Sequence, residues 1–430
     1  MASVLLAPIL SAQNPITPPG TYLADPSAHQ WKDGKVYVYG SRDEANGTYC
    51  SRFYDVLSSS DLIQWTMHQD VFASVGNRDE VDYSDNLLYA PDCLEKDGKY
   101  YLYYCMSGGG EDEGVAVGKS PVGPFKSGKR IKGISQIDPA AFVDDDGKAY
   151  LCWGQFSAKV ARLKPEMNEV DLSTMCQNIL TEKEHHFHEG IQMIKRNGIY
   201  YLIYAHIGRR GQATCIGYSM GNTPIGPFRY GGVIIDNFGC DPNVWNNHGS
   251  IAEVNGKWYV FYHRATEGGA TMRKACIEPI EFNADGTINE VEMTTQGAAG
   301  PLNPFMKMEA ERACYLTGHV RTHTCDNKVE ALAEIRHLDT AAFKYFDFKK
   351  RPCKITLQLT SKRGGKIEVY ANNLCRPLLA TLEVPPSDGV TPLRLTKEIT
   401  SELTGIAPIY MRFKGETDAD LFNVDWFVFE

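Results

Sequence analysis

Apolar and polar positions follow a pattern that recurs five times along the chain. Each copy begins with an Asp-Gly or Asn-Gly turn and continues into a strand rich in aromatic and β-branched residues. The copies are DGKVYVYGS (33–41), DGKYYLYYC (97–105), DGKAYLCWG (146–154), NGIYYLIYA (197–205) and NGKWYVFYH (255–263). Such turns suit two-residue β-hairpins. The pattern therefore predicts five units, each built around a hairpin.

The uneven intervals between the copies leave room for about four short strands in each unit. Helical periodicity is almost absent before residue 300. A radial array of four-stranded sheets satisfies this pattern, because every sheet buries its faces against its neighbours. We therefore predict an all-β protein in which residues 1–300 form a five-bladed β-propeller.

The repeat stops after residues 283–304, a stretch rich in Gly, Pro, Asn and Thr. Short alternating runs follow, among them KITLQLTSK, KIEVYANN and VDWFVFE. They predict a second domain at residues 305–430, an antiparallel β-sandwich of the jelly-roll type.

Three of the five units carry an acid eight positions before the turn: Asp25, Asp138 and Glu189. The second unit has Tyr89 at this position, and the fifth has Asn247. If the turn joins the innermost strand of a blade to the next strand, equal offsets mean nearly equal height and radius. We therefore expect the three carboxyl groups to converge at one mouth of the central channel.

Crowded carboxyl groups raise one another's pKa and cost stability unless they are hydrated, paired or protonated. One interpretation is that they are solvated acids at strand ends. The other is glycoside hydrolysis, which needs one protonated and one ionised carboxyl group on opposite sides of the sugar. A third acid near the proton donor would keep it protonated.

Five segments in order resemble a known family: YLADPS, YAPD, QIDPAAFVDDDGKAYL, HFHEGIQMIKRNGIYYLIY and NNHGSIAEVNGKWYVFYHR. They are similar to the inverting five-bladed propellers of glycoside hydrolase family 43, which includes β-xylosidases, α-L-arabinofuranosidases and arabinanases. The resemblance covers about residues 14–300. It implies that Asp25 is the general base, that Glu189 is the general acid, and that Asp138 tunes and orients the acid.

Further site residues follow from the same resemblance. His248 is expected to contact a central water or calcium ion, although a core histidine fits equally well, and no other cofactor is expected. Arg264 is expected to reach the sugar, with a surface charge as the alternative. Tyr89 stands where many members have Trp and is expected to stack on a sugar. In EHHFHEG the spacing does not suit a zinc site, and His188 is expected to line the pocket.

The segments FMKMEAERA, GGKIEVYANN and GETDADLFNVDWFVFE resemble family 6 carbohydrate-binding modules over residues 305–430. The Trp usual before the last strands of such modules is missing, because PSDGVTPLRLTKEIT contains no aromatic residue. A module that braces the propeller is therefore as good an interpretation as one that binds sugar. Tyr315, Tyr345 and Tyr370 are the candidate binding aromatics.

The chain has 44 basic and 53 acidic side chains and a formal net charge of -9, which disfavours nucleic acid or an anionic membrane as a partner. There is no apolar run of the roughly 18 residues that a membrane span needs. The start, MASVLLAPILSAQ, has no positively charged region typical of a signal peptide. The start is therefore at best a weak or trimmed signal peptide, and a periplasmic or secreted location is the expectation. Among the 12 cysteines, Cys314, Cys325, Cys353 and Cys375 could pair, and the sequence predicts no oligomeric state.

Together these features predict an inverting, exo-acting glycosidase that releases α-L-arabinofuranose or β-xylose from plant cell-wall polysaccharide. Arabinofuranose is preferred because it is frequent in the family. The alternatives are a non-catalytic glycan-binding propeller and an endo-acting arabinanase-type hydrolase. Retention of all three acids argues against the binder.

Overall fold

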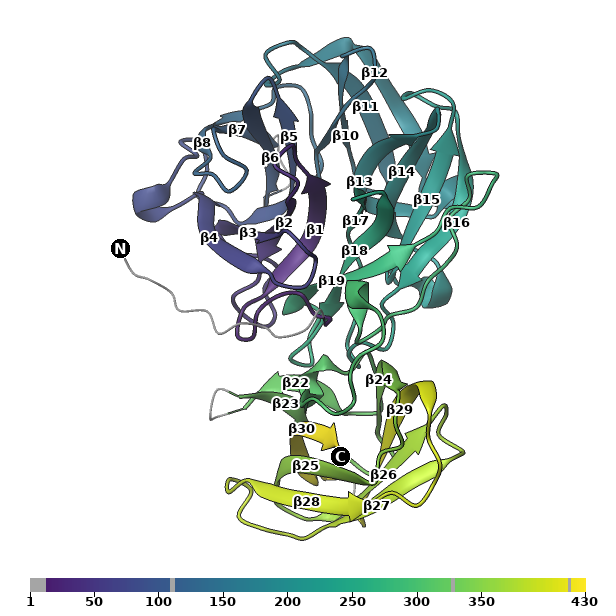
Figure 1. The fold of residues 1–430 in the computed structure, drawn as a ribbon. Helices are drawn as coiled ribbons and strands as arrows, with labels where there is room; N and C mark the ends of the chain where they lie inside the picture. The colour runs from purple at the N-terminus through teal and green to yellow at the C-terminus, as the bar shows by residue number, and fades with distance from the viewer. Residues whose placement is uncertain (1–12, 109–112, 326–328, 417–418) are drawn as a thin grey trace.

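The computed structural model describes all residues except 1–12, 109–112, 326–328 and 417–418, and it contains two all-β units (Figure 1). In the larger unit, consecutive antiparallel strands form five separate sheets. The innermost strand β1 contacts both β5 and β17, and β9 contacts β5 and β13, so the inner strands surround a common axis. The predicted five-bladed β-propeller, like the all-β class, is confirmed.

In each of the first four sheets the strands lie side by side in chain order, with the first strand nearest the axis. The first sheet contains β1 (Leu23–Gln30), β2 (Val36–Arg42), β3 (Phe53–Ser59) and β4 (Thr66–Ala73). The second contains β5 (Leu88–Lys96), β6 (Lys99–Met106), β7 (Gly114–Gly118) and β8 (Lys126–Arg130). The third contains β9 (Ala140–Val143), β10 (Ala149–Trp153), β11 (Ser157–Leu163) and β12 (Val170–Thr181). The fourth contains β13 (Phe187–Arg196), β14 (Ile199–His206), β15 (Cys215–Gly221) and β16 (Phe228–Asp236).

The five repeated turns join the first two strands of each sheet, as the offset argument requires. Apolar and aromatic side chains of the second strands fill the layers between neighbouring sheets; Tyr39 and Tyr104, for example, share one buried cluster. The single short α-helix, among the described residues, is α1 (Glu182–His185), which leads into β13. Threonine 181 caps it, since the Thr181 side chain accepts a hydrogen bond from Glu184 N.

The fifth sheet has three strands of its own: β17 (Ser250–Val254), β18 (Lys257–Ala265) and β19 (Arg273–Ile280). Residues 14–17 lie along its outer edge, where Ile16 N donates to Ala275 O over 2.8 Å and Ala275 N donates to the Thr17 hydroxyl. The beginning of the described chain thus covers the edge of the last sheet.

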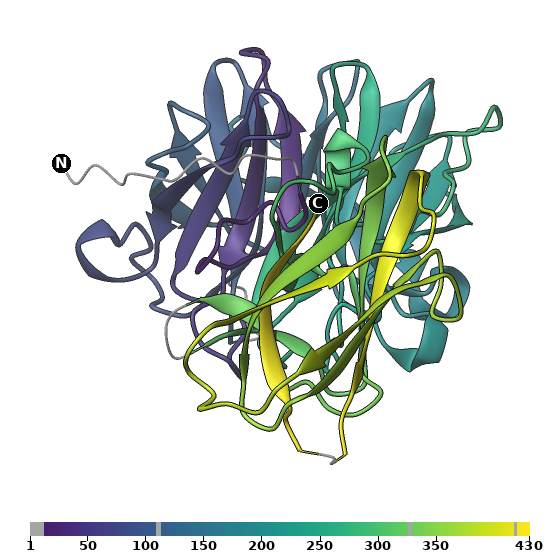
Figure 2. The same cartoon turned by 60° about the horizontal axis from the view of Figure 1, so that its bottom comes forward.

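Residues 305–430 form a sandwich of two antiparallel sheets, the predicted second fold, which Figure 2 brings to the front. One sheet contains β22 (Arg321–Thr324), β23 (Glu330–Ala333), β30 (Phe422–Phe429), β25 (Lys354–Ser361) and β28 (Leu393–Glu398), with β20 (Met308–Glu309) beside β30. The other contains β21 (Tyr315–Thr317), β24 (Thr340–Phe348), β29 (Gly405–Lys414), β26 (Gly365–Ala371) and β27 (Leu378–Val384). A cluster that includes Phe343, Phe413 and Phe427 fills the space between them.

The sandwich packs on loops of the propeller. Leu316 N donates to Gly239 O over 2.6 Å, and Glu267 N donates to Thr322 O over 2.8 Å. The Tyr315 ring lies so close to Gly239 that a β-carbon there would be 2.3 Å from it. Tyr345 OH donates to Glu292 in the segment between the domains.

The three tyrosines proposed from the sequence as sugar-binding aromatics therefore have structural contacts. Tyr315 and Tyr345 face the propeller, while Tyr370 is buried and donates to Glu368. Cys314 is buried and Cys353 and Cys375 are exposed, and none of these three forms a disulfide. The helices in the described residues are all too short or too polar to cross a membrane.

Candidate active site

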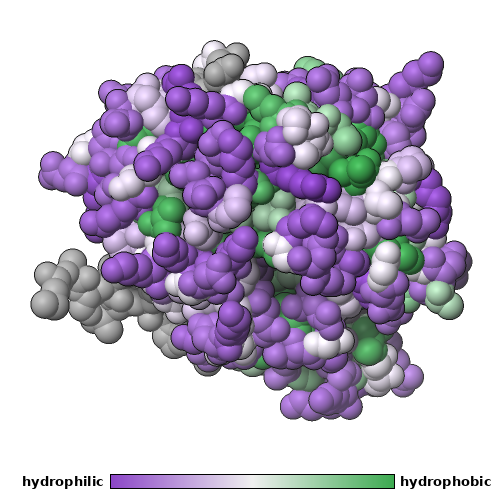
Figure 3. Space-filling model, turned by 90° about the horizontal axis from the view of Figure 1, so that it is seen from above, coloured by the Kyte–Doolittle hydropathy of each residue, from purple (hydrophilic) through white to green (hydrophobic). Residues whose placement is uncertain are grey.

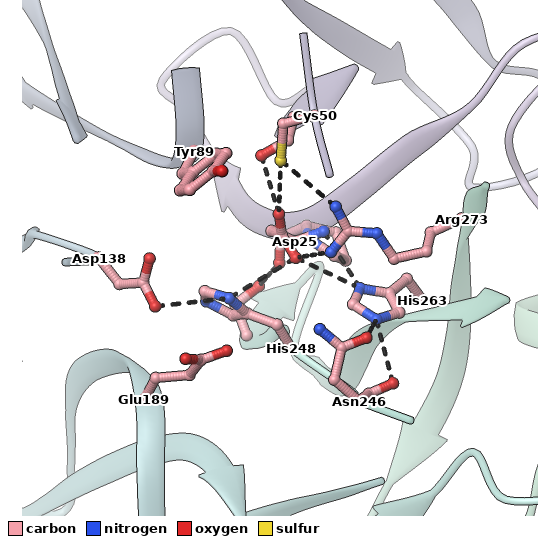
Figure 4. A network of polar contacts seen from close by, with 12 residues as sticks. Asp25, Cys50, Tyr89, Asp138, Glu189, Asn246, His248, His263 and Arg273 are labelled. Carbon is pink, nitrogen blue, oxygen red and sulfur yellow. Dashed lines mark hydrogen bonds and ion pairs between the residues drawn. The ribbon is translucent and has the colours of Figure 1, made fainter. Parts of the chain in front are cut away.

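A pocket of about 360 Å³ opens at one end of the propeller axis, and all five sheets or their loops contribute to its lining. Asp25, Asp138 and Glu189 all line it, although they come from three different sheets. Figure 4 shows Asp138 and Glu189 on one side of His248, with Asp25 and Arg273 on the other. The structure thus brings the three sequence-predicted acids into one site.

Irregular pairing at the start of the inner strands directs these side chains into the pocket. The register of β1 shifts between Ala24 and Ser27, and that of β13 shifts on both sides of Glu189. Asp25 and Asp138 themselves have positive φ angles of 53° and 59°. Such conformations are costly for residues other than glycine, and they gather at functional sites.

Asp25 is held ionised by its neighbours. Arg273 Nη1 donates to Asp25 Oδ1 over 2.7 Å, and the Ser41 hydroxyl donates to Oδ2 over 2.8 Å. Burial alone would raise the pKa of Asp25, but its neighbours, above all the charge of Arg273, outweigh burial and place this pKa below its ordinary value. Asp25 is therefore suited to accept a proton from water.

Arg273 is fixed in turn by a second buried acid. Its Nε and Nη2 atoms donate to the two oxygens of Asp43, each over 2.9 Å. Both side chains are almost fully buried, so the pair fills and orients the wall beside Asp25.

His263 fixes the backbone of the same acid. Asp25 N donates to His263 Nδ1 over 3.2 Å, and His263 Nε2 lies 3.3 Å from Asn246 O. Burial, followed by the charge of Arg273, lowers the pKa of His263 to about 3. The ring is therefore neutral, with its proton on Nε2, where it is donated to Asn246 O.

Asp138 has the opposite protonation tendency. Burial raises its pKa well above the ordinary value, and the charges of Glu189 and Asp25 raise it further. Asp138 N donates to Cys105 Sγ over 3.3 Å, which anchors the residue to the second sheet. Close carboxyl groups that cannot both ionise share a proton. Asp138, with Glu189 near enough to raise its pKa, is therefore the proton-holding group on this side of the pocket.

Glu189 receives one well-placed hydrogen bond. Gln155 Nε2 donates to Glu189 Oε2 over 2.8 Å, and His188 Nε2 lies 3.8 Å from the same oxygen. Because Oε2 is an acceptor in this contact, a proton carried by Glu189 belongs on Oε1. That oxygen is left to meet a substrate.

His248 lies at the axis between the acids, with Nδ1 3.7 Å from Asp25 Oδ1 and 4.0 Å from Asp138 Oδ2. Burial lowers the pKa of His248, although the charges of Asp25 and Glu189 act in the opposite direction. The ring packs over Gly190, where a β-carbon would lie 2.7 Å from Nε2. Gly190 has a φ of +64°, so both conformation and space require glycine there.

The sequence predicts that His248 contacts either a water molecule or a calcium ion in the central channel. The adjoining axial cavity measures only about 20 Å³, and calcium takes six to eight oxygen ligands. Asp92 Oδ1 already accepts from Ser27, Asp92 Oδ2 accepts from Ala141 N, and Gln192 Oε1 accepts from Ile251 N. Within the described residues, no three His, Cys, Asp or Glu side chains converge as ligands. These residues do not fit a directly ligated calcium ion.

The other sequence-predicted residues have different outcomes. Tyr89 and His188 line the pocket. Arg264 does not reach it: this residue is buried, and its Nη2 donates to Tyr262 OH over 2.7 Å and to Thr294 O over 2.7 Å. Side chains alternate along β18, so His263 faces Asp25 and Arg264 faces the opposite layer.

Sequence reasoning missed Arg273, Gln155 and Trp245, which all line the pocket. Arg273 begins the third strand of its sheet, outside the repeated hairpin. Gln155 directly follows the third copy of the repeat. Its position after the end of a second strand is the one sequence feature that could have placed it near the pocket. Trp245 lies in the long loop between β16 and β17.

Comparisons with known proteins assign both parts of the chain to known families. The profile of glycosyl hydrolases family 43 matches residues 12–288, and that of the family 6 carbohydrate binding module matches residues 309–430. A xylosidase/arabinosidase of Thermoclostridium stercorarium is 30% identical, over 89% of this chain and 95% of its own length. An arabinoxylan arabinofuranohydrolase of Bacillus subtilis (strain 168) is also 30% identical, over 94% and 90%.

Solved structures give the same result. A family 43 arabinoxylan arabinofuranohydrolase from Bacillus subtilis, in complex with cellotetraose, superposes with a TM-score of 0.56 at 26% identity and covers 97% of this chain and 99% of its own. A β-xylosidase/α-arabinofuranosidase from a compost metagenome, in a calcium-free form with xylotriose, has a TM-score of 0.57 at 32% identity and covers 66% and 99%.

Proposed function

The chain belongs to family 43 of the glycosyl hydrolases and is a glycoside hydrolase, and from that premise we propose that it removes single pentose units from plant cell-wall polysaccharide with inversion of configuration. α-L-Arabinofuranose is the preferred unit, and β-xylose is the second candidate. The names of the similar Thermoclostridium and Bacillus proteins support this choice. The pocket, which is closed by residues of all five sheets, supports action on a chain end or side chain.

One observation carries the proposal: Asp25, whose pKa is lowered, and Asp138, whose pKa is raised, both lie next to His248 at the axis. Asp25, with its lowered pKa, takes a proton from water as that water attacks the sugar. Glu189 gives its Oε1 proton to the leaving oxygen on the other side. Asp138, whose pKa is raised by burial and by the charge of Glu189, holds a proton beside the general acid and orients it.

The family's acid-base chemistry needs no cofactor, and we propose that this chain holds water rather than calcium next to His248. The size of the axial cavity and the prior engagement of its oxygen atoms support this. Turnover should therefore persist after exhaustive treatment with a chelator, and loss of turnover that added calcium restores would contradict the proposal.

We also propose that the protein acts outside the cytoplasm, where its polymeric substrate lies. Cell fractionation would test this location.

The test uses arabinoxylan with three variants. Asp25→Asn and Glu189→Gln should each lower kcat by roughly 10²–10⁴-fold, while Glu166→Gln, an exposed acid in the turn between β11 and β12, should retain wild-type activity. The identity of the released sugar decides between arabinose and xylose, and NMR of the first product decides its anomeric configuration. Retained activity in both pocket variants would refute the assignment.

A further inference from the structure

Three aromatic rings lie in a row beside the general acid. The His188 ring is 5.3 Å from the Phe156 ring and 5.7 Å from the Trp245 ring, with edge-to-face geometry in both pairs. His188 is buried, whereas Phe156 is 53% and Trp245 41% exposed. Two exposed rings thus contact a buried one: His188 and Trp245 line the pocket, and Phe156 directly follows Gln155, which also lines it.

Phe156 is held at the rim at a conformational cost. Its φ is +61°, a region that bulky residues rarely adopt. Phe156 N donates to His188 O over 2.6 Å, and Phe156 O accepts from Glu182 N over 3.3 Å. The segment is thereby tied to the fourth sheet, yet the ring gains little burial. Strain of this kind points to a role outside folding.

Trp245 is presented from an equally well-anchored loop. Two residues further on, Asn247 N donates to Ala213 O over 2.6 Å and Asn247 Nδ2 donates to Thr214 O over 3.1 Å. Asn246 O is in contact with His263. The exposed ring therefore sits on fixed backbone, which limits the entropy lost when a ligand binds it.

The row lies on the leaving-group side of the site. Its central ring is adjacent to Glu189 in the chain, and Gln155, next to Phe156, donates to Glu189. Asp25 and Arg273 lie on the other side of His248 (Figure 4). A general acid stands beside the oxygen that leaves, so a surface next to Glu189 meets the part of the substrate that departs.

We propose that Phe156 and Trp245 form an aglycone platform that binds a backbone sugar ring of the polysaccharide while the pentose occupies the pocket. This rests on the proposed function and adds a specificity determinant to it. The C–H face of a pyranose suits an aromatic face, and a few such contacts dominate binding in sites of this kind. Seen from above, the molecule has a mostly hydrophilic surface that apolar patches interrupt (Figure 3).

The experiment compares two leaving groups on the full-length protein. For an arabinose-substituted xylo-oligosaccharide and for methyl α-L-arabinofuranoside, kcat/KM is measured in the wild type, Phe156→Ala, Trp245→Ala and the double variant. The methyl group cannot cover the platform. We expect the ratio of oligosaccharide to methyl glycoside kcat/KM to fall by roughly tenfold in each single variant and further in the double variant.

Two additional variants make the result specific. Phe156→Tyr keeps a ring and should keep the wild-type ratio, while Ile225→Ala removes a 49% exposed side chain at the far end of the fourth sheet and should not change it. An unchanged ratio in the double variant, with turnover intact, would overturn the platform and leave the proposed function standing. No turnover of arabinosides or xylosides by the wild type would overturn the proposed function itself.

Discussion

At the scale of single residues, the site depends on a buried arginine that holds the base ionised. Arg273 contacts Asp25 and both oxygens of Asp43. The negative charge of Asp25 is stabilised mainly by this cation, because burial acts in the opposite direction. The pH at which Asp25 becomes protonated therefore depends on Arg273, which belongs to the last sheet of the propeller, whereas Asp25 belongs to the first.

Replacing Arg273 should change the pH profile in a defined direction. In Arg273→Met the pKa of Asp25 rises, so the base is protonated over a wider range and the acidic limb of kcat/KM moves to higher pH by about one unit or more. Arg273→Lys keeps a positive charge and should show a smaller displacement. The measurement is kcat/KM against pH, with circular dichroism at each pH to verify folding.

A matched control removes an arginine that has only a surface role. Arg209 forms a bidentate pair with Glu290 and is half exposed, so Arg209→Met should leave the acidic limb in place. An acidic limb that does not move in folded Arg273→Met would show that Asp25 does not depend on this cation.

At the scale of elements, the repeated hairpins allowed the five sheets and the approximate position of three acids to be predicted. A tight turn fixes the register of its two strands, so an offset counted from Asp33 or Asn197 remains meaningful along the inner strand. What the repeat cannot encode is contact between sheets. Arg273 starts β19, and its distance from Asp25 depends on how the ring of sheets closes.

The mistaken expectation for Arg264 has a related cause. The repeat places the YHR segment on the second strand of the fifth sheet. It does not specify which of two adjacent side chains faces the axis. The structure turns His263 toward Asp25 and Arg264 toward Thr294. The bulges that direct Asp25 and Glu189 are likewise invisible in an apolar-polar pattern, because they change backbone angles without changing composition.

Closure of the propeller depends on one amide side chain. Asn14 is fully buried, and its Nδ2 donates to Ile277 O, Glu278 Oε1 and Thr294 O over 2.9, 2.9 and 3.0 Å. Its Oδ1 accepts from Ile277 N over 2.9 Å. The residue thus joins the first described segment to β19 and to the segment between the two domains.

Asn14→Ala should therefore destabilise the protein by at least about 2 kcal/mol, because it leaves several buried polar groups without partners. Urea unfolding followed by tryptophan fluorescence measures the free energy of unfolding. Asn77→Ala, at an exposed position in the short 3₁₀ turn Gly76–Arg78, should change this free energy by less than about 0.5 kcal/mol. Similar values for the two variants would argue against the role of Asn14 in closing the ring.

At the scale of the whole molecule, the second domain is a structural partner of the propeller. Two of its backbone hydrogen bonds reach the loops after β16 and β18, which belong to the same end of the propeller as the pocket. Figure 1 shows the sandwich below the sheets. Two of its candidate binding tyrosines are occupied at this interface. This arrangement favours the bracing interpretation of the domain for Tyr315 and Tyr345.

The clearest link between the domains is a buried ion pair. Lys274 Nζ contacts both oxygens of Glu330, and the side chains are 4% and 5% exposed. Glu330 also accepts from Gly20 N over 2.6 Å. Breaking a buried pair from one side leaves an uncompensated charge and costs about 3–5 kcal/mol. Lys274→Ala and Glu330→Ala should each be strongly destabilising.

A double-mutant cycle tests whether this cost belongs to the pair. The double variant removes both charges, so its loss of unfolding free energy should be smaller than the sum of the single losses by more than about 1 kcal/mol. The matched pair Lys164 and Glu169 lies within the third sheet and is exposed, so its cycle should give a coupling near zero. Additive losses for Lys274 and Glu330 would mean that the domains are held together by their apolar and backbone contacts instead. A large coupling would mean that the position of the sandwich next to the pocket depends on this ion pair. The two charges meet only when both domains are folded.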